Sequence, residues 1–125
     1  NFQSSYYKRK KKILDLFKKE NYIVNKEKIK LKTLNNQFKN FSFDFVDVLK
    51  IDTEGFEFDV IKGASSCLKK IKFIYFEHHF DSMIIKSYKF SEIHEYLKNN
   101  NFKKILKIKM PLRKTFEYIY ENRTH

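Results

Sequence analysis

The 125-residue sequence contains one cysteine, one proline, two glycines and no tryptophan. The single cysteine, Cys67, excludes an internal disulfide and is typical of a protein of the reducing cytoplasm. We interpret it as a small core residue of a helix over residues 56–70. No apolar run approaches the ~20 residues of a membrane-spanning helix, and the first residues lack the pattern of a signal peptide. The sequence therefore predicts a cytoplasmic protein without a membrane span.

Acidic residues are scarce in the first third of the chain. Residues 1–40 hold 12 of the 27 Lys and Arg residues but only three acids, so most of the net charge of +12 lies there. The excess is mostly lysine, in a chain also rich in Asn, Ile and Phe, and these four residues share A/T-rich codons. Codon bias is therefore the favoured explanation of the lysine excess. The alternative is that the run from Lys8 to Lys12 binds an anionic partner, but no nucleic-acid module surrounds it and nucleic acid is not favoured.

Aromatic and aliphatic residues are abundant enough to form a core. The sequence has 14 Phe and 8 Tyr, and 42% of its residues are hydrophobic. This composition predicts one small globular domain, because the chain is too short for two. A helix is expected from Ser4 or Ser5 to about residue 19, as a basic lead-in to the rest.

The central stretch, residues 45–64, reads as a strand, an acidic turn and a helix. Residues 45–51 form a nearly continuous apolar run, which predicts a strand covered on both faces. The apolar period then becomes helical, with Glu57 and Asp59 in the first turn of the helix, where carboxylates favour the positive end of its dipole. Gly63 is expected to cap or kink this helix. Carboxyl ends of parallel strands are where open α/β folds bind ligands, so the turn is the expected site.

The flanking segments predict more strands and helices around this stretch. Residues 28–34 alternate and predict a half-exposed strand toward the sheet edge, followed by a polar connection over 35–44. A short helix ending at residues 69–70 precedes a second apolar strand over 73–76, which closes in residues 77–79. This strand–helix–strand order implies a right-handed parallel crossover between the two strands. Ser91 is expected to cap the next helix. Residues 105–110 and 116–120 predict two strands too closely spaced for a crossover, hence antiparallel. The expected fold class is α/β.

The central stretch also carries a resemblance to a known family. Leu49-Lys-Ile-Asp-Thr-Glu-Gly55, followed by Glu57 and by Val60-Ile-Lys-Gly-Ala64, resembles the signature of the FkbM-type methyltransferases. The resemblance extends from about residue 30 to the end of the chain. It implies dependence on S-adenosylmethionine and the C-terminal half of a class I, Rossmann-like methyltransferase sheet, in which parallel strands end in an antiparallel pair. Residues 1–125 are then a single partial domain, in which residues 1–27 lead into the matching part 28–125.

The resemblance implies methyl transfer to a hydroxyl of a glycan or another secondary metabolite, which needs positioned reactants and often a base. Asp52 is assigned first, as a donor-contacting residue or base, with Gly55 also at the donor. Glu54 comes second, and would share a side with Asp52 if the backbone stays extended; alternatively, it caps the following helix. No metal site is predicted.

The end of the next strand supplies further candidates. Glu77 resembles a glutamate often found there in the family, and would bind donor or acceptor unless it only forms a strand-end salt bridge. His78 or His79 is a candidate acceptor-side base. Adjacent strand residues point to opposite faces, so the two histidines do not suit one zinc ion. His94 is expected on a helix surface and His125 in the tail.

Two departures from the family pattern limit the expected activity. A class I methyltransferase holds the donor in a Gly-rich loop, whereas Gly55 and Gly63 are the only glycines here. A Leu-Asp-Asp sequence of the family corresponds to Leu34-Asn-Asn36, so two carboxylates are replaced by amides. We therefore expect a C-terminal fragment of a longer enzyme that is inactive alone. The alternative function is a non-catalytic basic module that binds an anionic partner through the run from Lys8 to Lys12.

Overall fold

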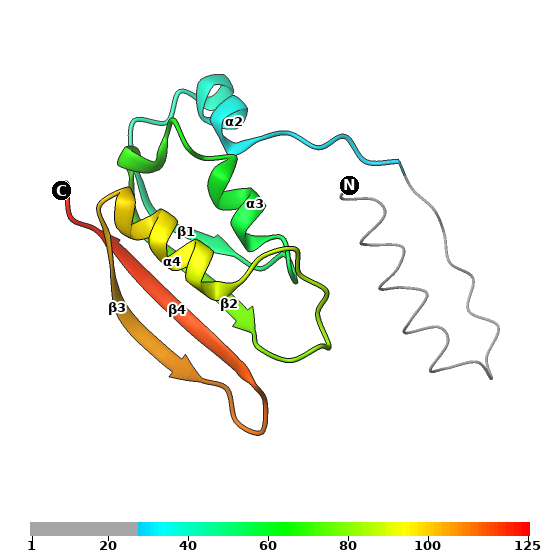
Figure 1. Ribbon diagram of the computed structural model, residues 1–125. Coiled ribbons are helices and arrows are strands. Elements are labelled where there is room, and N and C mark those ends of the chain that lie inside the picture. The colour runs from blue at the N-terminus through cyan, green and yellow to red at the C-terminus, as the bar shows by residue number, and fades with distance from the viewer. Residues whose placement is uncertain (1–27) are drawn as a thin grey trace. The chain divides into compact units, whose positions relative to one another are not determined.

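A computed structural model of the protein describes residues 28–125 (Figure 1). The described part contains a four-stranded sheet with the strand order β1-β2-β4-β3. The strands are β1 (Val46–Ile51), β2 (Ile71–His79), β3 (Phe102–Lys109) and β4 (Thr115–Asn122). The helices are α2 (Leu34–Phe41), α3 (Glu57–Lys62) and α4 (Phe90–Asn99), with a short 3-10 turn η1 (Leu68–Lys70) before β2. The mixed α/β class predicted from the sequence is confirmed.

The sheet combines one parallel pair of strands with antiparallel ones. β1 and β2 run parallel, with Ile51 opposite Phe76, and the chain between them contains α3. A parallel pair needs such a crossover connection, whereas the short link from β3 to β4 makes an antiparallel hairpin. Both pairings were predicted. The sequence did not predict that β4 returns to lie between β2 and β3, antiparallel to both.

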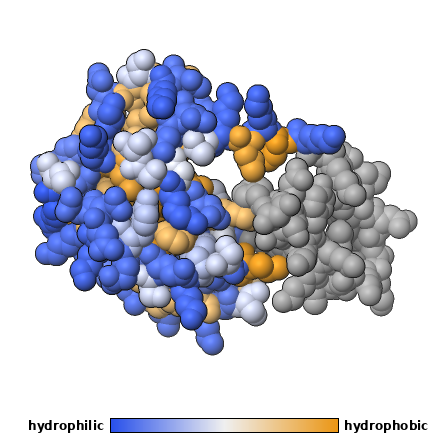
Figure 2. All heavy atoms as spheres, turned by 45° about the horizontal axis from the view of Figure 1, so that its top comes forward, coloured by the Kyte–Doolittle hydropathy of each residue, from blue (hydrophilic) through white to orange (hydrophobic). Residues whose placement is uncertain are grey.

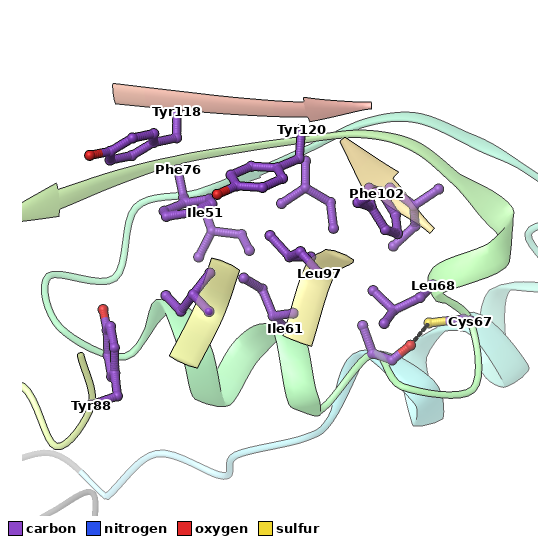
Figure 3. Close-up of a cluster of buried hydrophobic side chains, with 14 residues drawn as sticks. Ile51, Ile61, Cys67, Leu68, Phe76, Tyr88, Leu97, Phe102, Tyr118 and Tyr120 are labelled. Atoms are coloured by element: carbon purple, nitrogen blue, oxygen red, sulfur yellow. Dashed lines mark hydrogen bonds between the residues drawn. The ribbon is translucent and has the colours of Figure 1, made fainter. Parts of the chain in front are cut away.

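The core lies between one face of the sheet and the helices α3 and α4 (Figure 3). Alternate residues of β2 and β4 point into it, because side chains of a strand alternate between its two faces. Ile61 from α3 and Leu97 from α4 are fully buried against them. The predicted core residue Cys67 is buried too, although α3 ends at Lys62 and Cys67 lies just before η1 rather than in a long helix. Its thiol donates to the Ala64 carbonyl.

The opposite face of the sheet is open within the described residues. The side chain of Val48 on β1 is 54% exposed, and Leu106 and Ile108 on β3 are also exposed. The prediction that the first strand is covered on both faces is therefore wrong for the part of the chain that the structure describes. In Figure 2, hydrophilic side chains cover much of the side of the described part that is turned toward the viewer, with hydrophobic ones between them.

The segment before β1 differs from the prediction. Residues 28–33 form no strand, and Ile29 and Leu31 are largely exposed, so the alternation there does not mark a sheet face. The predicted polar connection contains helix α2 instead. Thr33 caps this helix, since its hydroxyl accepts a hydrogen bond from the backbone N–H of Asn36. This N-cap starts the helix at Leu34, so the chain leaves the extended conformation at the end of the predicted strand.

Helix α4 begins two residues earlier than predicted. The residue before its first turn is Lys89, and Ser91 already lies inside the helix. The side chain of Glu92 accepts from the Lys89 backbone N–H at 2.7 Å, so the helix is capped before the expected serine. Ile93 and Leu97 face inward and are fully buried. The predicted helix before residue 20 lies outside the described residues, and none of the described helices is long and apolar enough to cross a membrane.

Candidate active site

The chain turns sharply at the carboxyl end of β1. Ile51 is buried, residues 52–54 are exposed, and Gly55 is buried again before α3 begins. Glu54 and Gly55 both have positive φ angles, 49° and 107°. Glycine adopts this conformation without the penalty that a Cβ would bring. Residues 52–56, here called the 52–56 turn, are therefore not extended, and the condition under which Asp52 and Glu54 would share one side is not met.

The buried side chain of Glu57 accepts hydrogen bonds from the 52–56 turn. Its side chain is only 3% exposed, although it is a carboxylate. The backbone N–H of Gly55 donates to both of its oxygens, at 2.9 Å and 3.1 Å. The hydroxyl of Thr53 donates to Oε1 at 3.2 Å. The sequence predicted Glu57 only as a charge favourable to the helix dipole, so its role in ordering the turn was missed.

A third donor to Glu57 comes from a distant segment. The hydroxyl of Tyr88 donates to Oε2 of Glu57, across 31 residues of sequence. Tyr88 lies in the connection between β2 and α4, residues 80–89, here called the 80–89 connection. Burial, and then its hydrogen bond to Glu57, raise the pKa of the Tyr88 phenol well above its usual value. No pattern in the sequence marks this tyrosine as a partner of the turn.

On the open face of the sheet, carboxylates surround the phenol of Tyr75. Its hydroxyl donates to Oε1 of Glu117 on β4 at 2.6 Å. This hydrogen bond is the main reason why the pKa of Tyr75 is raised to about 12, and the negative charges of Glu77 and Asp52 raise it further. The charges of two predicted site residues, Glu77 and Asp52, thus act on one phenol. Asp52 itself is exposed, with a loose contact of 3.9 Å to Lys50.

Glu77 is held by a chain of hydrogen-bonding groups. One of its carboxylate oxygens, Oε1, lies 2.7 Å from Nε2 of His79. The other ring nitrogen of His79, Nδ1, lies 3.0 Å from the hydroxyl of Thr115 on β4, which is fully buried. This contact is the form that the predicted alternative, a pairing of Glu77 at the strand end, takes here. With both ring nitrogens engaged, His79 is suited to orient Glu77 rather than to take a proton from a substrate.

His78 points to the other face of β2, as the alternation of the strand predicts. Its ring is 3% exposed and packs against the rings of Phe80, Tyr88 and Phe90. Burial, with the nearby positive charge of Lys86, lowers the pKa of His78 to about 4. Nδ1 of the ring has no hydrogen-bond partner among the described residues. A buried ring of this kind does not reach an acceptor, so the geometry argues against the predicted base.

The remaining polar groups do not extend the site. His94 was expected on the surface, but it is partly buried and its Nδ1 lies 2.9 Å from the hydroxyl of Tyr120. Within residues 28–125, no group of three or more His, Cys, Asp or Glu side chains is arranged to hold a metal ion. A depression of about 370 Å³ is lined by Ser65, Ser66, Leu68, Lys69, Asn99, Asn100, Asn101 and Thr124, none of which is a predicted site residue.

Comparison with known proteins supplies one match. The chain matches the model of the family described as the methyltransferase FkbM domain over residues 4–104. The match begins within the basic lead-in and ends inside β3, so it includes all the predicted site residues. Comparisons with curated proteins and with solved structures gave no match.

Proposed function

Because the chain belongs to the methyltransferase FkbM family, we propose that it serves S-adenosylmethionine-dependent methyl transfer to a hydroxyl group of a glycan or another secondary metabolite. The observation that supports this most directly is the position of two carboxylates. Asp52 follows β1 and Glu77 lies near the end of β2, and these strands are adjacent and parallel. Side chains at this edge of an open α/β sheet face the usual ligand crevice.

Glu77 is the residue that we assign to the acceptor. The contact with His79 fixes the position of its carboxylate, and the side chain remains 28% exposed and so accessible. A carboxylate held in this way can accept the proton of an acceptor hydroxyl while the oxygen attacks the methyl group. His78 is not suited to this step, because it is buried on the opposite face of β2.

Asp52 is the residue that we assign to the donor. S-adenosylmethionine supplies a methyl group on a positively charged sulfur, and leaves as a neutral thioether after transfer. The exposed carboxylate of Asp52 suits hydroxyl or ammonium groups of such a donor. Gly55 lets the chain turn there, and its N–H is already used by Glu57, so we assign it to the shape of the site. Glu54 stays a secondary candidate on the exposed side of the turn.

We expect residues 1–125 by themselves to be inactive. Gly55 and Gly63 are their only glycines. A Gly-rich loop allows close approach of the backbone to a nucleotide-like ligand, and residues 1–125 contain no such loop. β1 is one of the two outermost strands of the described sheet. Further strands therefore have room to pair with β1, beside the strand that leads into Asp52. We further propose a cytoplasmic location, which the free, buried thiol of Cys67 supports.

The test compares residues 1–125 with the longest polypeptide encoded by the reading frame that contains them. Both are incubated with methyl-labelled S-adenosylmethionine and with hydroxyl acceptors such as glycans, and transfer of label is measured. Label transfer by the longer polypeptide alone is expected. In it, Glu77→Gln should lower kcat by about 100-fold or more, the usual effect of losing a general base. Asp81→Asn, which changes a carboxylate of the 80–89 connection, is the control. Equal rates for the Glu77 variant and wild type would refute the assignment.

The alternative function is binding of an anionic partner by the run from Lys8 to Lys12. This run lies outside the described residues, so its support is the sequence alone. The alternative predicts polyanion affinity that falls steeply with salt and weakens when these residues are changed to glutamine. We favour methyl transfer because the family match already includes residues 8–12.

A further inference from the structure

Glu57 is the only buried carboxylate among the described residues. Burying a charged group is strongly unfavourable unless hydrogen bonds replace the water that it loses. Three different groups donate to Glu57: the Gly55 N–H, the Thr53 hydroxyl and the Tyr88 hydroxyl. A carboxylate accepts several such bonds, whereas an apolar residue of the same size would accept none. The burial of this charge therefore points to a specific task.

The donors to Glu57 belong to two separate segments. Gly55 and Thr53 are in the 52–56 turn, which directly follows β1, and Tyr88 is in the 80–89 connection, which directly follows β2. Figure 3 shows Tyr88 at one end of the buried cluster, apart from the side chains packed between sheet and helices. Its ring also packs against Phe58 of α3, at 5.8 Å between ring centroids. Glu57 therefore connects the two segments at the edge of the sheet that carries Asp52 and Glu77.

We propose that Glu57 is a positioning residue, which fixes the 52–56 turn and, through Tyr88, ties it to the 80–89 connection. The inference rests on the proposed function in one respect, because the turn that Glu57 fixes presents Asp52 to the donor. Asp52 has only a loose contact of its own, at 3.9 Å from Lys50. Its position is set by the neighbouring residues, and Thr53 and Gly55 are the ones bonded to Glu57.

The backbone of the turn explains why such an anchor is needed. Glu54 has a φ of 49°, which is uncommon for a residue with a side chain, and Gly55 has great conformational freedom in the unfolded chain. Local preference therefore does not select this turn. The bonds from the Gly55 N–H to both carboxylate oxygens oppose rotation of the peptide that precedes Gly55.

Amide hydrogen exchange of the 125-residue chain, followed by NMR, tests the anchor without any donor or acceptor. In Glu57→Gln, exchange of the Gly55 amide should become about tenfold to hundredfold faster, as expected when a buried hydrogen bond to a charged group is lost. Asp59→Asn is the matched control, since Asp59 is in the same helical turn but is half-exposed and paired with Lys62. The amide of Phe76 in β2 reports the sheet and should not change in either variant.

Tyr88→Phe provides a second variant that keeps the ring and removes only its hydroxyl. It should accelerate Gly55 exchange by about three- to tenfold, because one donor of the carboxylate is lost while the turn keeps its own bonds. Unchanged Gly55 exchange in both Tyr88→Phe and Glu57→Gln would overturn the proposal. Faster exchange of Phe76 and Gly55 together in both variants would overturn it as well, because the effect would then be on the whole fold.

A kinetic measurement on the longer, active polypeptide separates this inference from the proposed function. Glu57→Gln should raise the KM for the methyl donor by about tenfold, with a smaller change in kcat, if Asp52 is displaced from its position. Asp59→Asn should leave both constants unchanged. An unchanged KM in Glu57→Gln would overturn the role in presenting Asp52. Failure of the proposed function would show differently, as absence of methyl transfer in wild type, while the exchange data would still decide whether Glu57 fixes the turn.

Discussion

Acidification should destabilise this protein through His78 in particular. The ring is buried among three aromatic side chains, and one of its nitrogens has no hydrogen-bond partner. Burial lowers its pKa from 6.5 to about 4, because the charged form loses water without gaining a partner. The groups that act on it are Lys86 and His79, which disfavour its positive charge, and Glu57, which favours it.

The sign of the effect follows from the two pKa values. The unfolded chain binds a proton at His78 more readily than the folded one, so stability falls as the pH falls. The contribution of His78 is fully present above about pH 6.5 and is lost as the pH approaches 4. Between about pH 7 and about pH 5, the two pKa values correspond to a loss of about 2 kcal/mol in the free energy of unfolding.

The assay is urea unfolding of residues 1–125 at a series of pH values, for wild type and for His78→Leu. Leucine fills a similar volume and does not titrate. The variant should lose about 2 kcal/mol less than wild type over the same interval, whatever its stability near neutral pH. His125→Gln is the control, because His125 is exposed in the tail and its replacement should leave the pH dependence as in wild type. Equal losses in wild type and His78→Leu would refute the reasoning.

Three further predictions concern stability and reactivity. Leu97→Ala should reduce the free energy of unfolding by about 2–5 kcal/mol in urea titrations, because the side chain is fully buried between α4 and the sheet; a loss below 1 kcal/mol would contradict this packing. Thr33→Ala should cost about 1 kcal/mol and speed amide exchange in α2, since the hydroxyl caps the Asn36 N–H; unchanged exchange there would contradict the cap. Burial raises the pKa of the Cys67 thiol, and a reagent can reach it only when the fold opens. Its reaction with a thiol reagent should therefore be at least about 100-fold slower in the folded protein than in the urea-unfolded chain. Equal rates would show that the thiol is accessible.

The sequence predicted the strands and helices whose apolar pattern is strong. Continuous apolar runs indicated β1 and β2, and the change to a helical period indicated α3 between them. The short link between the last two strands required the antiparallel hairpin. These features depend on neighbours in the sequence, so the sequence is sufficient to predict them.

The predictions failed where a local pattern competed with another interaction. Residues 28–34 alternate as a strand does, but Thr33 caps α2 and no described strand pairs with them. Ser91 is a good capping residue, yet the helix begins before it, where the Lys89 N–H donates to the Glu92 side chain. In both cases the helix starts at a position other than the one that the residue pattern indicated.

The sequence also indicated candidate carboxylates at the ends of β1 and β2 but not their partners. Asp52 and Glu77 were assigned from the family resemblance and because carboxylates at the ends of parallel strands meet at one edge of a sheet. The sequence alone could not decide which of His78 and His79 is buried, because that depends on which face of β2 the helices cover. The structure buries His78 against α4 and leaves His79 to orient Glu77.

The amino-acid sequence by itself determined the family, the order of strands and helices after residue 45, and the acidic turn on which the proposed function rests. Only the tertiary structure decided that β4 lies between β2 and β3, that one face of the described sheet is open, and that Glu57 is buried with Tyr88 as its partner. The physical reason is the range of the interactions. Apolar periodicity is a property of residues that are close in the sequence. A buried charge, by contrast, is stable only where distant parts of the chain bring it hydrogen-bond donors.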